Sequence, residues 1–178
     1  MSQKKQIRII VTGPQGSGKT TFVENLTSLA KDRYTIGGFL SHGTWLGNKR
    51  DSFTIEDLMT GQAELLCDQQ DTPGSIKFRH FFFKPRGFIF GECAIEHAIR
   101  SKYKIIVFDE IGPMELQANG WAGSLTKALS GFCPLIIMVV RQSLVEKCID
   151  HWKIKGAEIY DTGQSTPGQL YKRICEII

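Results

Sequence analysis

The sequence lacks a long apolar run, a secretion signal and a cysteine pattern typical of a metal site. Its longest apolar runs, such as residues 135–140, are far shorter than the roughly 18 to 20 residues that cross a bilayer. The basic start is followed by a short strand-like segment and glycines, without the apolar core of a signal peptide. The five cysteines include no Cys-x-x-Cys pair and no nearby histidine at ligand spacing. We therefore expect a cytoplasmic protein with no membrane span, zinc site or disulfide framework.

The chain also lacks a strong charge of either sign. Lysine and arginine number 22 against 18 acidic residues, and the net charge of +4 is too small to indicate nucleic-acid binding. The length of 178 residues and the 42% hydrophobic content are typical of one globular domain rather than a disordered chain. We predict a single domain over residues 1–178, and no feature of the sequence indicates its oligomeric state.

Near-continuous apolar runs at residues 7–11, 105–108 and 135–140 are typical of strands buried on both faces of a parallel sheet. Apolar residues at helical spacing lie between them, at residues 22–30 and 94–99. Further helices are expected at residues 123–130, at 143–152 and after Pro167, with a short strand at 158–160. This alternation predicts an α/β fold, mainly a parallel sheet flanked by helices.

Residues 36–90 have a different pattern, with short apolar runs separated by glycines, threonines and polar turns. The turns are expected at residues 47–51 and at Thr60-Gly61. We interpret the segment as an insertion of antiparallel β-hairpins that follows the first helix and makes up about a third of the chain.

The strongest motif lies between the first strand and the first helix. Residues 13–20 read Gly-Pro-Gln-Gly-Ser-Gly-Lys-Thr and match the Walker A pattern Gly-x-x-x-x-Gly-Lys-[Ser/Thr] at every specified position. Glycines let successive backbone N–H groups turn inward toward phosphate oxygens, and the helix N-terminus adds positive potential. The alternative is a chance glycine-rich turn. The residues predicted to bind the nucleotide are Gly13, Pro14, Gln15, Gly16, Ser17, Gly18, Lys19, Thr20 and Thr21, the last by packing or capping beside the loop.

Two carboxylates follow the buried run at residues 105–108. Asp109 is expected to act as the Walker B acid, holding Mg²⁺ through water beside the Thr20 hydroxyl, while Lys19 reaches the β- and γ-phosphates of ATP or another nucleoside triphosphate. Glu110 is placed to orient and deprotonate a water in line with the γ-phosphate, which favours hydrolysis. The alternatives are a surface cap for the strand and a structural role for Glu110.

Arg141 directly follows the run at residues 135–140, so it is expected at the same edge of the sheet. There its fixed charge would stabilise the γ-phosphate during transfer, and the alternative is a surface ion pair. Glu115 has two interpretations as well, as an extension of the acidic site or as a helix cap.

Basic and aromatic residues alternate over residues 77–90. One interpretation is a platform on which single-stranded nucleic acid stacks. The other, which we prefer, is a strand that buries its aromatic face and exposes its charges. Trp45 or one of these aromatics stacking on a nucleotide base is a variant of the first interpretation.

The Walker A loop, the segment that starts at Gly37-Gly38-Phe39-Leu40 and residues 109–116 (Asp-Glu-Ile-Gly-Pro-Met-Glu-Leu) together resemble the cancer-related nucleoside triphosphatase family, small P-loop NTPases also known from thermophiles. The resemblance implies a RecA-like sheet and slow Mg²⁺-dependent hydrolysis of several nucleoside triphosphates. It supports the roles of Lys19, Thr20, Asp109 and Glu110 and draws attention to Arg141. Pro113 stands where many members have lysine, and residues 40–44 lack the acids of the family's hairpin.

We therefore predict an enzyme that hydrolyses nucleoside triphosphate to diphosphate and phosphate. One alternative is a P-loop kinase in which the 36–90 insertion holds a small-molecule acceptor. Another is a nucleotide-dependent module that binds nucleic acid through residues 77–90. No base-reading motif such as Asn-Lys-x-Asp is present, so the preferred base is not predicted.

Overall fold

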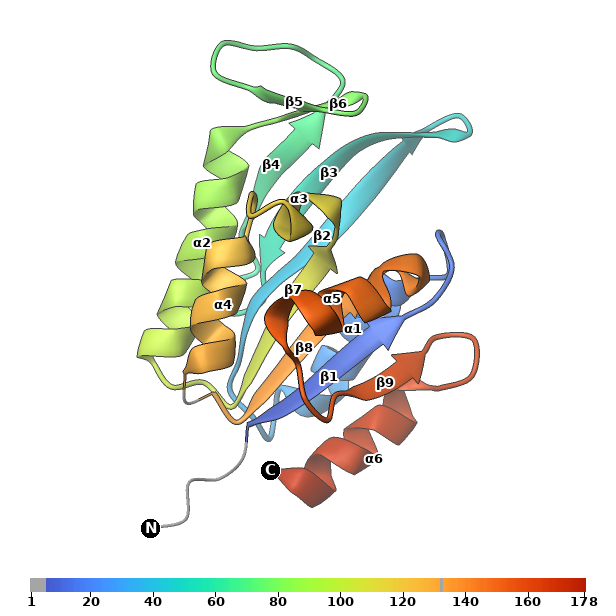
Figure 1. Cartoon of the computed structure of the whole chain (residues 1–178), viewed down its shortest axis with the longest axis vertical. Coiled ribbons are helices and arrows are strands. Elements are labelled where there is room, and N and C mark those ends of the chain that lie inside the picture. The colour runs from blue at the N-terminus through green and yellow to red at the C-terminus, as the bar shows by residue number, and fades with distance from the viewer. Residues whose placement is uncertain (1–5, 132) are drawn as a thin grey trace.

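The computed structural model describes residues 6–131 and 133–178, which form one nine-stranded sheet with helices on both faces (Figure 1). The strand order is β5-β6-β4-β3-β2-β7-β8-β1-β9. The sheet is mixed, with a parallel half that carries the helices of an α/β fold and an antiparallel half built by the insertion.

The parallel half has the order β2-β7-β8-β1-β9. The predicted apolar runs lie in its three central strands, whose Ile and Val side chains are buried on both faces. This confirms the α/β prediction. The strands are β1 (Ile7–Thr12), β2 (Ile36–Leu46), β7 (Ile105–Ile111), β8 (Leu135–Val140) and β9 (Glu158–Asp161).

The antiparallel half contains the predicted hairpins, but its first strand also belongs to the core. Residues 36–39 of β2 pair in parallel with residues 105–108 of β7, and β2 pairs with β3 only from Phe39 onward. The insertion therefore extends the central sheet instead of standing apart from it. Its other strands are β3 (Lys49–Asp57), β4 (Ala63–Asp68), β5 (Ile76–Phe78) and β6 (Phe81–Phe83).

The strand expected near residue 90 is wrong, because the hairpins end at Phe83 and helix α2 (Pro85–Arg100) begins two residues later. Pro85 occupies the first helical turn, where its missing N–H costs nothing. Phe88 and Phe90 therefore pack against the core from a helix. Residues 77–83 are also not one strand, since a turn at Arg79 and His80 separates β5 from β6.

The helices cover the sheet in two layers. Helices α2, α4 (Ala122–Ser130) and α5 (Val145–Trp152) pack on one face, and α1 (Lys19–Ala30) and α6 (Pro167–Ile177) pack on the other (Figure 1). The short helix α3 (Pro113–Leu116) follows β7, and a 3₁₀ turn (Gln142–Leu144) precedes α5. None of the helices in the described ranges has the length and apolarity to cross a bilayer.

Gly38 is required where β2 lies against β7. Its φ of 96° is in a region that other residues avoid, and an added Cβ would overlap the carbonyl of Val107. We expect Gly38→Ala to lower the free energy of unfolding by about 3 kcal/mol in urea titrations. Gly61→Ala is the matched control, because Gly61 has a φ of 68° but no atom within 4 Å of an added Cβ. Its expected cost is about 1 kcal/mol, and equal losses in the two variants would contradict the role of this close approach.

Candidate functional site

The predicted site residues meet at one edge of the parallel sheet. The Walker A loop follows β1, Asp109 and Glu110 lie near the carboxyl end of β7, and Arg141 follows β8. Because these strands are parallel, their carboxyl ends lie at the same edge, where open α/β sheets bind ligands. Strand β2 also runs past this edge and adds Ser41 to the site.

The loop before α1 has the backbone shape that its glycines allow. Gly16 and Gly18 have φ values of 78° and 76°, and Gly18 immediately precedes the first residue of α1. Gly13 is needed for close packing, since an added Cβ would lie 2.7 Å from Ser17 Oγ. The Ser17 hydroxyl is itself 2.9 Å from that of Thr162, in the loop after β9. These contacts fix the loop in front of the helix N-terminus, a favourable place for phosphate.

Lys19 lies in the first turn of α1, and its amine folds back over the loop. Its Nζ donates to the carbonyls of Gly13 at 3.1 Å and Pro14 at 2.7 Å. Burial lowers the pKa of Lys19, whereas the nearby carboxylates of Glu110 and Asp109 favour its charged form. The ammonium group is thus held over the surface on which the loop would bind phosphates.

Asp109 is fully buried, which is costly for a carboxylate. Its Oδ2 accepts a hydrogen bond from the backbone N–H of Ser41 at 3.0 Å. Burial, together with the charge of Glu110, raises the pKa of Asp109 to about 7, and the hydrogen bond from the Ser41 N–H acts in the opposite direction. A nearby cation would offset the cost of burying the charged carboxylate of Asp109.

These residues fit a magnesium ion. Asp109 Oδ1 is buried without a hydrogen-bond partner among the described residues. The Thr20 hydroxyl donates a long hydrogen bond of 3.5 Å to the carbonyl of Ser41, the residue whose backbone N–H binds the same carboxylate. An unpaired carboxylate oxygen beside a hydroxyl is the hard oxygen donor set that Mg²⁺ prefers.

Glu110 is turned away from the regular path of β7. Its φ is 67°, unusual for a residue other than glycine, and the pairing of β7 with β8 shifts in register between Phe108 and Ile111. This bulge lets Asp109 point into the protein while Glu110 stays half-exposed. The Oε2 atom of Glu110 lies 3.7 Å from Nη2 of Arg141. Backbone strain of this kind often occurs at functional sites.

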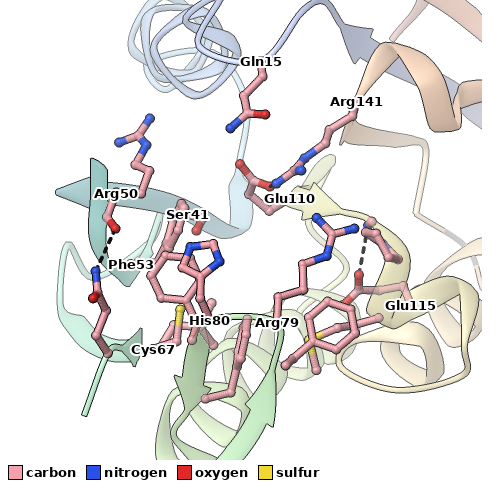
Figure 2. A pocket seen from close by; sticks show the side chains of 18 of the residues that line it. Gln15, Ser41, Arg50, Phe53, Cys67, Arg79, His80, Glu110, Glu115 and Arg141 are labelled. Atoms are coloured by element: carbon pink, nitrogen blue, oxygen red, sulfur yellow. Dashed lines mark hydrogen bonds and ion pairs between the residues drawn. The ribbon is translucent and has the colours of Figure 1, made fainter. Parts of the chain in front are cut away.

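A cavity of about 820 Å³ opens beside this pair (Figure 2). Gln15, Glu110 and Arg141 line it on the side of the Walker A loop. Aromatic and basic side chains of the 36–90 insertion line the opposite side, among them Arg50 and Arg79. The cavity therefore extends from the expected position of the γ-phosphate toward the hairpins.

Glu115 serves as a helix cap. Its carboxylate accepts the N–H of Gly112 at 2.9 Å and that of Trp121 at 3.3 Å, which orders the turn through α3. This confirms the helix-cap interpretation, and the side chain also lines the cavity. Burial raises the pKa of Glu115 to about 7, against the effect of these hydrogen bonds.

The raised pKa of Glu115 predicts a pH dependence of stability. Between its ordinary pKa of 4.5 and about 7, the unfolded chain has lost this proton while the folded chain keeps it. The stability contributed by Glu115 is therefore present below pH 4.5 and is lost as the pH rises toward 7, by about 3 kcal/mol. We expect the difference in unfolding free energy between wild type and Glu115→Gln to change by about that amount across this range. A difference that stays constant from pH 4.5 to 8 in urea titrations would contradict the assignment.

The structure brings Lys19, Thr20, Asp109, Glu110 and Arg141 to one place, as the sequence predicts. Of the predicted loop residues, Pro14, Gln15, Gly16, Ser17, Gly18 and Thr21 are exposed, Gly13 is buried, and Thr21 lies on α1 beyond the loop. Sequence reasoning missed two contributors. Ser41 contributes through its backbone, which no side-chain motif reveals, and Thr162 comes from a loop 145 residues after Ser17.

Comparisons with known proteins identify the family of this chain. A family model described as NTPase matches residues 8–175. Nucleoside-triphosphatase THEP1 of Thermococcus kodakarensis is 33% identical over 140 residues, 76% of this chain and 77% of the relative. The protein of the same name from Natranaerobius thermophilus is 29% identical over 94% of this chain and 96% of its own.

Solved structures show the same fold. A human cancer-related nucleoside triphosphatase superposes with a TM-score of 0.71 at 21% identity and covers 96% of both chains. THEP1 from Aquifex aeolicus superposes with a TM-score of 0.69 at 20% identity and covers 97% of both. These structures confirm the predicted P-loop NTPase fold, and the family model and the relatives confirm the family resemblance.

Proposed function

Because the chain belongs to the NTPase family, we propose that it hydrolyses nucleoside triphosphates to diphosphate and phosphate, with Mg²⁺ held by Thr20 and Asp109 and with a water positioned by Glu110. The observation that carries this proposal is the placement of Glu110. Its carboxylate is half-exposed, lines a cavity and stands next to the buried Asp109 at the edge that carries the Walker A loop.

The loop and Lys19 bind the phosphates in this account. The N–H groups around Gly16 and Gly18 face the triphosphate, and the Lys19 ammonium stabilises the charge that develops on the transferred group. Mg²⁺, when bound, neutralises charge on the β- and γ-phosphate oxygens.

Glu110 orients the attacking water and accepts its proton. The half-exposed carboxylate of Glu110 lines the cavity and can reach a water there, whereas the buried Asp109 cannot. Arg141 contacts Glu110, which holds the carboxylate in place and puts a guanidinium at the same edge. This geometry supports transfer to water rather than to a second substrate.

Phosphate release from ATP, GTP, CTP and UTP, with Mg²⁺ and with a chelator, tests the proposal. We expect release that requires Mg²⁺ and differs modestly among the four bases. Release at the same rate in chelator would contradict the role given to Thr20 and Asp109.

Arg141→Met is expected to lower kcat about 10- to 100-fold. The substitution removes the guanidinium charge that stabilises the transferred phosphoryl group, and it removes the ion-pair partner of Glu110. Arg173→Met is the matched control. Arg173 pairs with Glu158 at 2.8 Å, between α6 and β9, and its loss should leave kcat within about twofold. Equal effects of the two substitutions would show that Arg141 is only a surface ion-pair residue.

A further inference from the structure

We propose that the cavity beside Glu110 binds a second small molecule, a planar aromatic compound that carries an anionic group. The proposal rests on the proposed function in one respect, namely that the γ-phosphate faces Glu110. It adds a ligand that the hydrolysis of a nucleoside triphosphate does not itself require.

Aromatic rings form much of the cavity wall. Phe83 and Phe88 stack with ring centroids 5.5 Å apart and an interplanar angle of 14°, and Phe53 meets Phe81 edge to face at 5.4 Å. Trp45 stands at the rim with 57% of its surface exposed, although burial of so large a ring is favourable. A flat apolar ligand would cover these faces. The aromatic lining consists of Trp45, Phe53, Phe78, Phe81, Phe83 and Phe88, together with the buried Trp121.

Positive charge is also concentrated in this cavity. Lys49, Arg50, Arg79 and Arg141 line it, whereas Glu110 and Glu115 are the acids among its described lining residues. The carboxylate of Glu115 already accepts two backbone N–H groups. The excess of cations favours an anionic ligand.

Two arginines are well placed for this role. Arg50 is held by a 2.6 Å hydrogen bond from Nη1 to the Gly43 carbonyl, and its guanidinium stacks on Trp45 at 4.1 Å from the ring centroid. Arg79 lies at the turn between β5 and β6 with a φ of 57°, and its guanidinium points into the cavity toward Glu110 and Glu115 (Figure 2). Guanidinium groups bind phosphate and carboxylate with two parallel hydrogen bonds.

The size and position of the cavity separate this ligand from the hydrolysed nucleotide. Its volume of about 820 Å³ falls in the usual range for small-molecule sites. The loop contributes Gln15 to the lining, and a γ-phosphate beside Gln15 and Glu110 would occupy one end. The other phosphates would lie on the N–H groups at the N-terminus of α1, and of residues 13–30 only Gln15 lines the cavity. The aromatic end of the cavity is therefore left for another molecule.

Calorimetric titration tests this inference with the protein saturated by Mg²⁺ and a non-hydrolysable nucleoside triphosphate analogue. The aromatic anions are adenosine 5′-monophosphate and riboflavin 5′-phosphate. Ribose 5-phosphate supplies the anion without a ring, and adenosine supplies a ring without the anion. We expect at least one aromatic phosphate to bind at one site per chain, at least about tenfold more tightly than either partial probe.

Arg79→Met should weaken binding of that probe about tenfold or more, because a charge-assisted hydrogen bond is lost. Arg86→Met is the matched control. Arg86 lies in the first turn of α2, is highly exposed and pairs with Glu64 of β4. Phosphate release without probe should stay within about twofold in both variants.

The inference is overturned if neither aromatic phosphate binds, if the analogue displaces the probe, or if Arg86→Met weakens binding as much as Arg79→Met. It is also overturned if a single-stranded oligonucleotide binds where the small probes do not, which would favour a nucleic-acid site. Failure of the proposed function has a separate signature, undiminished hydrolysis in Glu110→Gln, which does not depend on probe binding.

Discussion

Glu110→Gln is expected to lower kcat for phosphate release about 100- to 1000-fold while changing nucleotide affinity little. Glutamine has nearly the same shape and can still contact Arg141, but it cannot accept a proton from water. The backbone at residue 110, with its φ of 67°, directs the side chain into the cavity, and the substitution does not change the backbone chemistry. Steady-state phosphate release, with affinity measured separately by analogue titration, gives the two quantities.

Glu64→Gln is the matched control for this substitution. Glu64 lies on β4, pairs with the exposed Arg86 of α2 and does not line the cavity. Its loss should leave kcat unchanged. Full turnover in Glu110→Gln would refute the proposed base and assign Glu110 a structural role.

Lys19→Met is expected to lower kcat/KM by about 100- to 1000-fold, because the ammonium group stabilises charge on the transferred phosphoryl group. The variant also loses the hydrogen bonds from Nζ to the Gly13 and Pro14 carbonyls, so the loop is less firmly held. Initial rates at low nucleotide concentration give kcat/KM directly.

Lys31→Met, at the exposed end of α1, is the control for loss of a lysine from the same helix. It should retain the wild-type kcat/KM. A Lys19→Met enzyme within about tenfold of wild type would mean that the loop does not bind the triphosphate as proposed.

The parallel core and its loop could be predicted because their signals are local. A buried apolar strand, a glycine-rich turn ending in Lys19 and an amphipathic helix follow one another directly in the sequence. The position of Asp109 followed from the buried run before it. These patterns depend on short-range periodicity and backbone geometry, which a single sequence displays.

The long-range features could not be predicted in the same way. The parallel pairing of residues 36–39 with β7 depends on the close approach at Gly38, whereas the sequence pattern assigned these residues to the antiparallel hairpins of the insertion. The start of α2 at Pro85 was missed because the aromatics around it also fit a strand. The left-handed backbone of Glu110 depends on a bulge between β7 and β8, which appears only once both strands are paired.

The cavity was missed for a related reason. The basic aromatic segment at residues 77–90 was noticed in the sequence, but its position opposite Glu110 depends on how β4, β5 and β6 extend the sheet. Arg50 and Trp45 join it from the hairpin of β2 and β3. A site assembled from six separate stretches of the chain leaves no local motif.

Single-turnover hydrolysis in ¹⁸O-labelled water, with Mg²⁺ and no added acceptor, tests the central claim most directly. If Glu110 directs water to the γ-phosphorus, each released phosphate gains one ¹⁸O atom and the diphosphate gains none. Label in the diphosphate, or no phosphate release until a second substrate is added, would contradict the account.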